Sequence, residues 1–118
     1  MAMTSTVFDE LLAQELSGVS FVQDYVQLQF NPSPLLNVLT PITVRSGEEF
    51  ARLGDPNFAN MLIGRINSYV DTVEFREANW LKIIFRDGAE ISLSLKESDY
   101  SGPEALNLVR RDGSIVVI

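Results

Sequence analysis

The sequence predicts an α+β fold, in which a mostly antiparallel and strongly curved sheet of about seven strands carries an N-terminal helix and one short crossover helix. Apolar and polar residues alternate over most of the chain, whereas helical spacing occurs in only two short stretches. So many strands around the core of a 118-residue chain would curl, in the extreme into a partly open barrel. This length also predicts a single domain, residues 1–118.

The N-terminal stretch is expected to form a short amphipathic helix. Thr6 is placed as N-cap, and Asp9 completes a capping box. Gly18 suits the position after the helix, because glycine adopts the left-handed conformation most easily. The apolar side chains that would share one helical face are Phe8, Leu11, Leu12 and Leu16.

A first hairpin is expected from Tyr25 onward. Val26, Leu28 and Phe30 alternate with polar residues, which is the pattern of a half-buried strand. The stretch "NPSP" at 31–34 supplies a turn, and "LLNVLTPITV" resumes as a second strand. Pro41 has no N–H for a sheet, so this strand is expected to be bent or at an edge.

A crossover helix of about two turns is expected after Asp55-Pro56, with aspartate as N-cap and proline as first helical residue. Its apolar face would include Phe58 and Leu62, and Gly64 would end it. After this helix the pattern is that of strands, at 69–76, 80–86 and 89–96, followed by a hairpin over 106–118.

Two Asp-Gly turns recur in "FRDGAE" and "RRDGSI". A two-residue loop at Asp87-Gly88 would place Phe85 beside Glu90 in the core. A three-residue loop pairs Phe85 with Ala89 instead and puts Gly88 at the left-handed position of a bulge.

The same reasoning at Asp112-Gly113 pairs Leu108 with Val116. Both turns are therefore expected to be structural, with positive φ at each glycine and with their arginines in solvent.

The composition excludes several kinds of chemistry. The chain has no cysteine and no histidine, which removes disulfides, thiolate nucleophiles, His-ligated metal sites and Ser-His-Asp triads. No catalytic residue, metal site or cofactor is predicted. The net charge of −7 repels phosphate backbones and anionic membranes, so nucleic acid and membranes are not expected partners. The N-terminus lacks the basic segment of a signal peptide and no apolar run approaches about 20 residues, so a cytoplasmic location is expected.

Asp71 is the charged residue that fits the strand pattern least. Parity places it on the apolar side of its strand, with Tyr69, Val73 and Phe75. A buried carboxylate there would have a raised pKa and would serve as an acid, a base or a ligand group. The alternative is that a bulge turns Asp71 outward, or that it caps a neighbouring backbone group.

Other candidate residues form two groups. Tyr69, Asp24 and Tyr100 are expected to join Asp71 as ligand-binding residues at the mouth of the curved sheet, although tyrosines at strand ends are commonly structural. Trp80, Lys82 and Ile84 share the outer face of one strand, and a tryptophan and an isoleucine among charges are typical of an interface. Simple solvent exposure is the alternative for this second group.

The stretch from Leu62 to Ile118 resembles a group of small uncharacterised bacterial proteins. In these proteins a strand–Asp-Gly–strand hairpin precedes a Tyr-x-Gly-Pro-Glu-Ala loop and a final strand, and "YSGPEA" at 100–105 is the most distinctive match. No activity is attached to the group. The resemblance therefore implies a compact, β-rich cytoplasmic domain and no functional residue.

The leading expectation for function is a non-enzymatic protein–protein interaction module that forms a homodimer. One version is an immunity- or antitoxin-like protein whose acidic surface suits a basic partner. The first alternative is a small-ligand binder that uses the concave face or mouth of the sheet. The second alternative is a carboxylate-based enzyme centred on Asp71.

Overall fold

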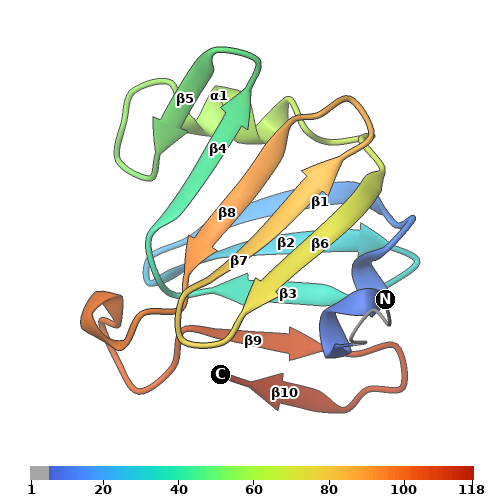
Figure 1. The fold of residues 1–118 in the computed structure, drawn as a ribbon, viewed down its shortest axis with the longest axis vertical. Coiled ribbons are helices and arrows are strands. Elements are labelled where there is room, and N and C mark those ends of the chain that lie inside the picture. Colours follow the sequence, from blue (N-terminus) through green and yellow to red (C-terminus); the bar gives the residue numbers. More distant parts are fainter. Residues whose placement is uncertain (1–5) are drawn as a thin grey trace.

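Alternating apolar residues bring the strands together as two antiparallel sheets that turn their apolar faces toward each other (Figure 1). The computed structural model describes residues 6–118. Sheet A has the order β1-β2-β3-β9-β10, and its strands are β1 (Glu15–Val22), β2 (Tyr25–Asn31), β3 (Leu35–Val38), β9 (Leu106–Val109) and β10 (Ile115–Val117). Sheet B has the order β5-β4-β8-β7-β6, and its strands are β4 (Ile42–Ser46), β5 (Glu49–Arg52), β6 (Val70–Arg76), β7 (Trp80–Phe85) and β8 (Glu90–Ser94).

The predicted antiparallel, strand-rich character is confirmed, but a single curved sheet of about seven strands is wrong. Pro41 lies between β3 and β4, which join different sheets instead of continuing as one bent strand. Strands β1 and β5 were not expected. The helical segments are short: η1 (Val7–Leu11), α1 (Phe58–Ile63) and η2 (Glu97–Asp99).

The N-terminal helix is shorter than predicted. Its capping box is confirmed, since the Thr6 hydroxyl accepts from the Phe8 N–H at 3.2 Å and the Asp9 carboxylate accepts from the Thr6 N–H at 3.4 Å. The segment is a single stretch of 3-10 helix, and Leu16 belongs to β1 instead of to a helical face. Gly18 likewise lies in β1, beside a bulge, and does not end a helix.

The two sheets also join at one corner. The N–H of Ala13 donates to the carbonyl of Val70 at 3.0 Å, and the N–H of Val70 donates to the carbonyl of Gln14 at 2.9 Å. Glu15 and Tyr69 form an isolated antiparallel bridge next to them. Backbone hydrogen bonds therefore connect the start of β1 to the start of β6.

Helix α1 covers one end of the core. Phe58 and Leu62 are buried as predicted, and Gly64 is the C-cap. The N-cap is Asn57 and not Asp55, whose carboxylate instead accepts from the Arg52 N–H at 2.9 Å. None of the helices formed by the described residues is long and apolar enough to cross a membrane.

Both Asp-Gly turns have the predicted geometry. Gly88 and Gly113 have φ of 89° and 88°. The N–H of Phe85 donates to the carbonyl of Ala89 at 2.8 Å, and Leu108 pairs with Val116, so both registers are confirmed. In each turn the aspartate side chain accepts from the N–H two residues on, at 3.0 Å from Ala89 and at 2.9 Å from Ser114.

An ion pair with an arginine connects each turn to an element distant in the sequence. Arg65, which follows α1, donates to Asp87 at 2.6 Å. In the second turn Arg110 donates to Glu10 of η1, so its side chain is not simply solvated as expected. These contacts lower the pKa of Asp87 and of Glu10 from their ordinary values, in each case mainly through the hydrogen bond from the arginine.

The turn glycines provide a stability test. Replacing Gly88 by valine forces a β-branched residue into a left-handed conformation, which is expected to cost about 1 kcal/mol or more. Gly102→Val is the matched control, because Gly102 lacks a positive φ and has no atom within 4 Å of an added Cβ. Thermal unfolding should show a lower Tm for Gly88→Val alone. Equal Tm values for the two variants would refute the turn geometry.

The Asp87–Arg65 pair predicts a pH dependence. The pKa of Asp87 is lowered on folding, so its contribution is complete above the ordinary value of 3.8 and is lost as the pH falls through the lower folded-state value. Asp87→Asn keeps an oxygen for the Ala89 N–H but removes the charge. Urea unfolding between about pH 5 and pH 2.5 should therefore show a smaller loss of stability for the variant than for the wild type. The same loss in both proteins would contradict this account.

Candidate interaction surface

Asp71 lies at a β-bulge in β6 and its side chain is exposed. Val70 and Thr72 pair with consecutive residues of β7, so Asp71 is the inserted residue. The inserted residue shifts the inward–outward alternation of the side chains by one position. Val70 before the bulge and Val73 after it can therefore both face the core. Of the two interpretations of Asp71, the outward bulge is therefore observed and the buried carboxylate is not.

The four expected ligand-binding residues do not come together. Tyr69 is bridged to Glu15 at the start of β1, and the Arg86 guanidinium lies 4.9 Å from the centre of its ring. Asp24 follows the opposite end of β1, in the turn to β2. Tyr100 follows η2, and its neighbour Ser101 lies at the same end of the sandwich as Asp24.

Trp80, Lys82 and Ile84 lie on the outer face of sheet B, as predicted for β7, and are half-buried there. We call this outer face the cation–aromatic face. Cross-strand pairing from β5 to β6 defines its positions. They are Thr43, Arg45, Phe50, Arg52, Thr72, Glu74, Arg76, Trp80, Lys82, Ile84, Glu90, Ser92 and Ser94.

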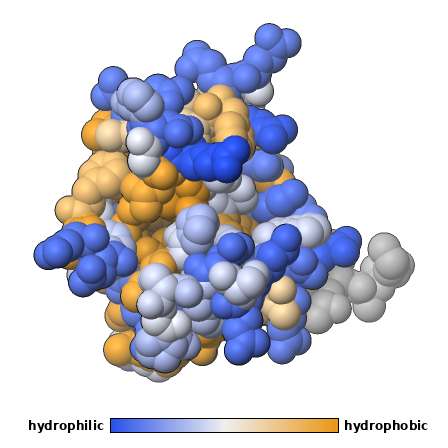
Figure 2. All heavy atoms as spheres, turned by 90° about the vertical axis from the view of Figure 1, so that its left-hand side faces the viewer, coloured by the Kyte–Doolittle hydropathy of each residue, from blue (hydrophilic) through white to orange (hydrophobic). Residues whose placement is uncertain are grey.

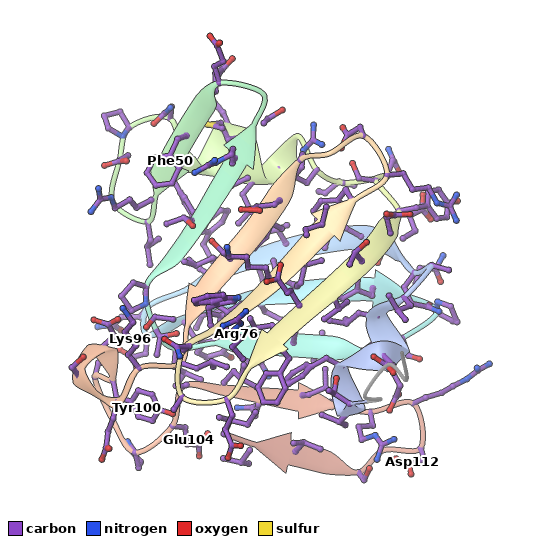
Figure 3. All side chains as sticks on the ribbon, in the orientation of Figure 1. Phe50, Arg76, Lys96, Tyr100, Glu104 and Asp112 are labelled. Atoms are coloured by element: carbon purple, nitrogen blue, oxygen red, sulfur yellow. The ribbon has the colours of Figure 1, made fainter. Side chains whose placement is uncertain are left out.

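Two aromatic rings on this face each lie against two cations. The guanidinium groups of Arg45 and Arg52 are 5.7 and 5.8 Å from the centre of the Phe50 ring. The guanidinium carbon of Arg76 and the ammonium nitrogen of Lys82 are 5.1 and 4.7 Å from the centre of the Trp80 ring. Figure 3 shows Phe50 on β5 and Arg76 on β6, at opposite edges of the sheet.

The charge on this face is opposite to that of the whole chain. Four basic and two acidic residues give it a net charge of +2, whereas the chain carries −7. Among residues 6–118 the ion pairs are Arg65–Asp87 and Arg110–Glu10, so none of these four cations has a carboxylate partner there. Cations that stack on aromatic rings without ion pairs remain available to an incoming anion.

A hollow of about 260 Å³ lies beside Trp80. Its lining includes Thr43 and Ser92, whose hydroxyl oxygens are 2.6 Å apart, and the two lysines Lys82 and Lys96. The Nε1 atom of Trp80 is buried without a hydrogen-bond partner. Hydroxyl and ammonium groups that line one hollow suit a carboxylate.

A larger depression of about 620 Å³ lies at the adjoining end of the sandwich. Phe21, Val22 and Leu53 line it and remain 44–52% exposed, and Figure 2 shows apolar surface gathered on this end of the molecule. Pro41 and Asp99 line both this depression and the hollow beside Trp80. The two therefore adjoin at these residues, and we call them together the end groove.

Part of this surface escaped the sequence reasoning. Phe50, Arg45 and Arg52 were missed because β5 was not predicted. The Ser46-Gly47 dipeptide was an available signal, since it is a typical turn pair and Gly47 has a φ of 61°. Within residues 6–118 no cluster of three or more carboxylates is placed to hold a metal ion.

No family model matches the chain, and neither a curated protein nor a solved structure is detectably similar to it. The resemblance noted for Leu62 to Ile118 stays a prediction.

The bulge can be tested with two neighbouring substitutions. Asp71→Asn should change the free energy of unfolding by less than about 0.5 kcal/mol, because the side chain is exposed. Val70→Asn should cost about 2 kcal/mol or more, because it places an amide at a position that is 1% exposed. Urea unfolding measures both. A larger loss of stability for Asp71→Asn than for Val70→Asn would show that β6 has no bulge and that Asp71 faces the core.

Proposed function

We propose that the protein is a non-enzymatic interaction module that binds an extended acidic segment of a partner protein along the end groove. The observation that carries the proposal is that a hollow lined by two hydroxyls and two lysines adjoins an apolar depression at Pro41 and Asp99. Carboxylates of the segment would meet Lys82 and Lys96, and an apolar side chain would meet Leu53 and Phe21.

The charge of the face favours an acidic segment over a basic one. Lys82, one of the unpaired cations of sheet B, lines the hollow together with Lys96, and Arg76 and Lys82 both lie over the Trp80 ring. The immunity- or antitoxin-like version with a basic partner remains a separate proposal, and it would use the acidic surface outside sheet B. A nucleic acid is less suited, because the apolar depression, which is half of the groove, offers little to a phosphate backbone.

A small-ligand binder is the second candidate. The depression of about 620 Å³ has the volume of a small-molecule site, and Asp24 lines it as a polar group. This function would use the apolar end alone and would leave Lys82 without a role. The two candidates therefore differ in whether the cations contribute to binding.

The fluorescence of Trp80 provides the readout, since the chain has a single tryptophan. The probe is a peptide of about twelve residues with glutamates in one half and leucine and phenylalanine in the other. The Trp80 emission is expected to change on addition of the peptide and to reach saturation. Lys82→Glu should raise the dissociation constant by about tenfold or more. Arg111→Glu is the matched control, because it makes the same charge change on the exposed second Asp-Gly turn.

Further arms of this titration separate the alternatives. Leu53→Ser should weaken binding of the mixed peptide but not of an all-glutamate peptide, because Leu53 lies only in the apolar part of the groove. A lysine-containing peptide and a DNA oligonucleotide of similar length should bind more weakly. Equal effects of Lys82→Glu and Arg111→Glu, or tighter binding of the DNA, would overturn the proposal.

A further inference from the structure

The outer face of sheet A carries no charged side chain from Gly18 of β1 to Val117 of β10, in a chain of which 21% of residues are charged. Glu15 lies beyond this region, at the corner where β1 meets Tyr69. We call this region the uncharged face. Its positions are Gly18, Ser20, Val22, Tyr25, Gln27, Gln29, Leu35, Asn37, Asn107, Val109, Ile115 and Val117.

A chain of side-chain amides crosses this face. Gln29 donates to Gln27 at 3.0 Å, Gln27 donates to Asn37 at 2.9 Å, and Asn37 donates to Asn107 at 2.7 Å. Gly18 leaves room for the first of them, since a Cβ there would lie 2.8 Å from Oε1 of Gln29. Because most of these amide groups are already paired with each other, covering the face leaves few polar groups unsatisfied.

Apolar residues accompany the amide chain up to the edge of the sheet. Ile115 and Val117 of β10 are 61% and 55% exposed, and both point to the outer side. Neither a charge nor a proline protects this edge strand, although natural edge strands usually carry one or the other. An exposed apolar strand beside an uncharged sheet face is typical of a surface that another protein covers.

A second copy of this chain fits the uncharged face better than a different protein does. Two copies that each carry −7 repel each other, and the repulsion at contact is smallest where neither presents a charge. Primary amides are both donors and acceptors, so the same surface is complementary to itself about a twofold axis. Five strands about 4.8 Å apart and about 17 Å long give a footprint of about 400 Å² per copy, which suits a weak dimer.

We infer that the protein forms a twofold-symmetric dimer in which the uncharged faces of two sheets A pack against each other. The cation–aromatic face remains on the outside of each subunit, and the end groove meets the interface only at Val22 and Tyr25, which line the depression as well. The dimer therefore uses a surface other than the Trp80 face to which the sequence pointed. This inference does not depend on the function proposed for the groove.

Analytical ultracentrifugation between about 5 µM and 1 mM protein tests the dimer, with an expected dissociation constant in the micromolar range. Raising NaCl from about 50 to 500 mM should strengthen the association, because salt screens the repulsion between the subunits while no ion pair crosses the interface. An interface between the cations of one copy and the carboxylates of another would respond in the opposite direction.

Val117→Glu should abolish the dimer, because it buries a charge within the contact, on the exposed edge strand β10. Thr72→Glu is the matched control, since it makes the same charge change at an exposed position of sheet B and should leave the dissociation constant within about twofold. The far-ultraviolet circular dichroism and Tm of both variants check that they fold. Peptide binding by Val117→Glu should be retained, which separates this test from that of the groove.

Three results would overturn the inference: a monomer throughout the concentration range, a dimer weakened by salt, or equal dimerisation of Val117→Glu and Thr72→Glu. If Val117→Glu fails to fold, Ile115→Glu replaces it, because Ile115 is the more exposed of the two side chains.

Discussion

The packing of the two inner sheet faces against each other is the constraint on which the rest of the structure depends. Residues such as Leu28 and Leu36 of sheet A and Ile83 and Ile91 of sheet B are fully buried between the sheets. Their burial fixes which side of every strand faces inward, and so selects the residues that remain outside. The bulge at Asp71 follows from the same constraint, because it lets Val70 and Val73 both reach the core while the carboxylate stays in solvent.

The outward residues are sorted by charge between the two sheets. Sheet A presents paired amides and apolar side chains, while sheet B presents cations that stack on Phe50 and Trp80. Packed sheets lie about 10 Å apart, so the two outer faces are on opposite sides of the molecule and can be occupied together. A weak dimer through sheet A would display two end grooves, and a partner with two acidic segments would then bind more tightly than either segment alone.

The sequence predicted local features better than the division into sheets. Strand parity was sufficient to place both Asp-Gly turns, their registers and the positive φ of Gly88, because these depend on neighbouring residues alone. Pairing between distant strands was not predictable, since the pattern that marks β3 and β4 does not say that Pro41 separates two sheets. The alternation correctly placed Trp80 and Lys82 on the outer face of their strand, whereas Phe50 and the end groove depend on β5 and on loops that only the tertiary fold brings together.

The central claim is that the two outer faces have separate roles, and backbone and side-chain amide chemical shifts measure this most directly. In a concentration series, the signals that move should be those of the uncharged face, including the side-chain amides of Asn37 and Asn107. In a titration with the acidic peptide, the signals that move should be those around Trp80, Lys82 and Leu53. Two sets of residues that overlap only at Val22 and Tyr25, which belong to both surfaces, would support the account. One shared set, or shifts spread over the whole molecule, would contradict it.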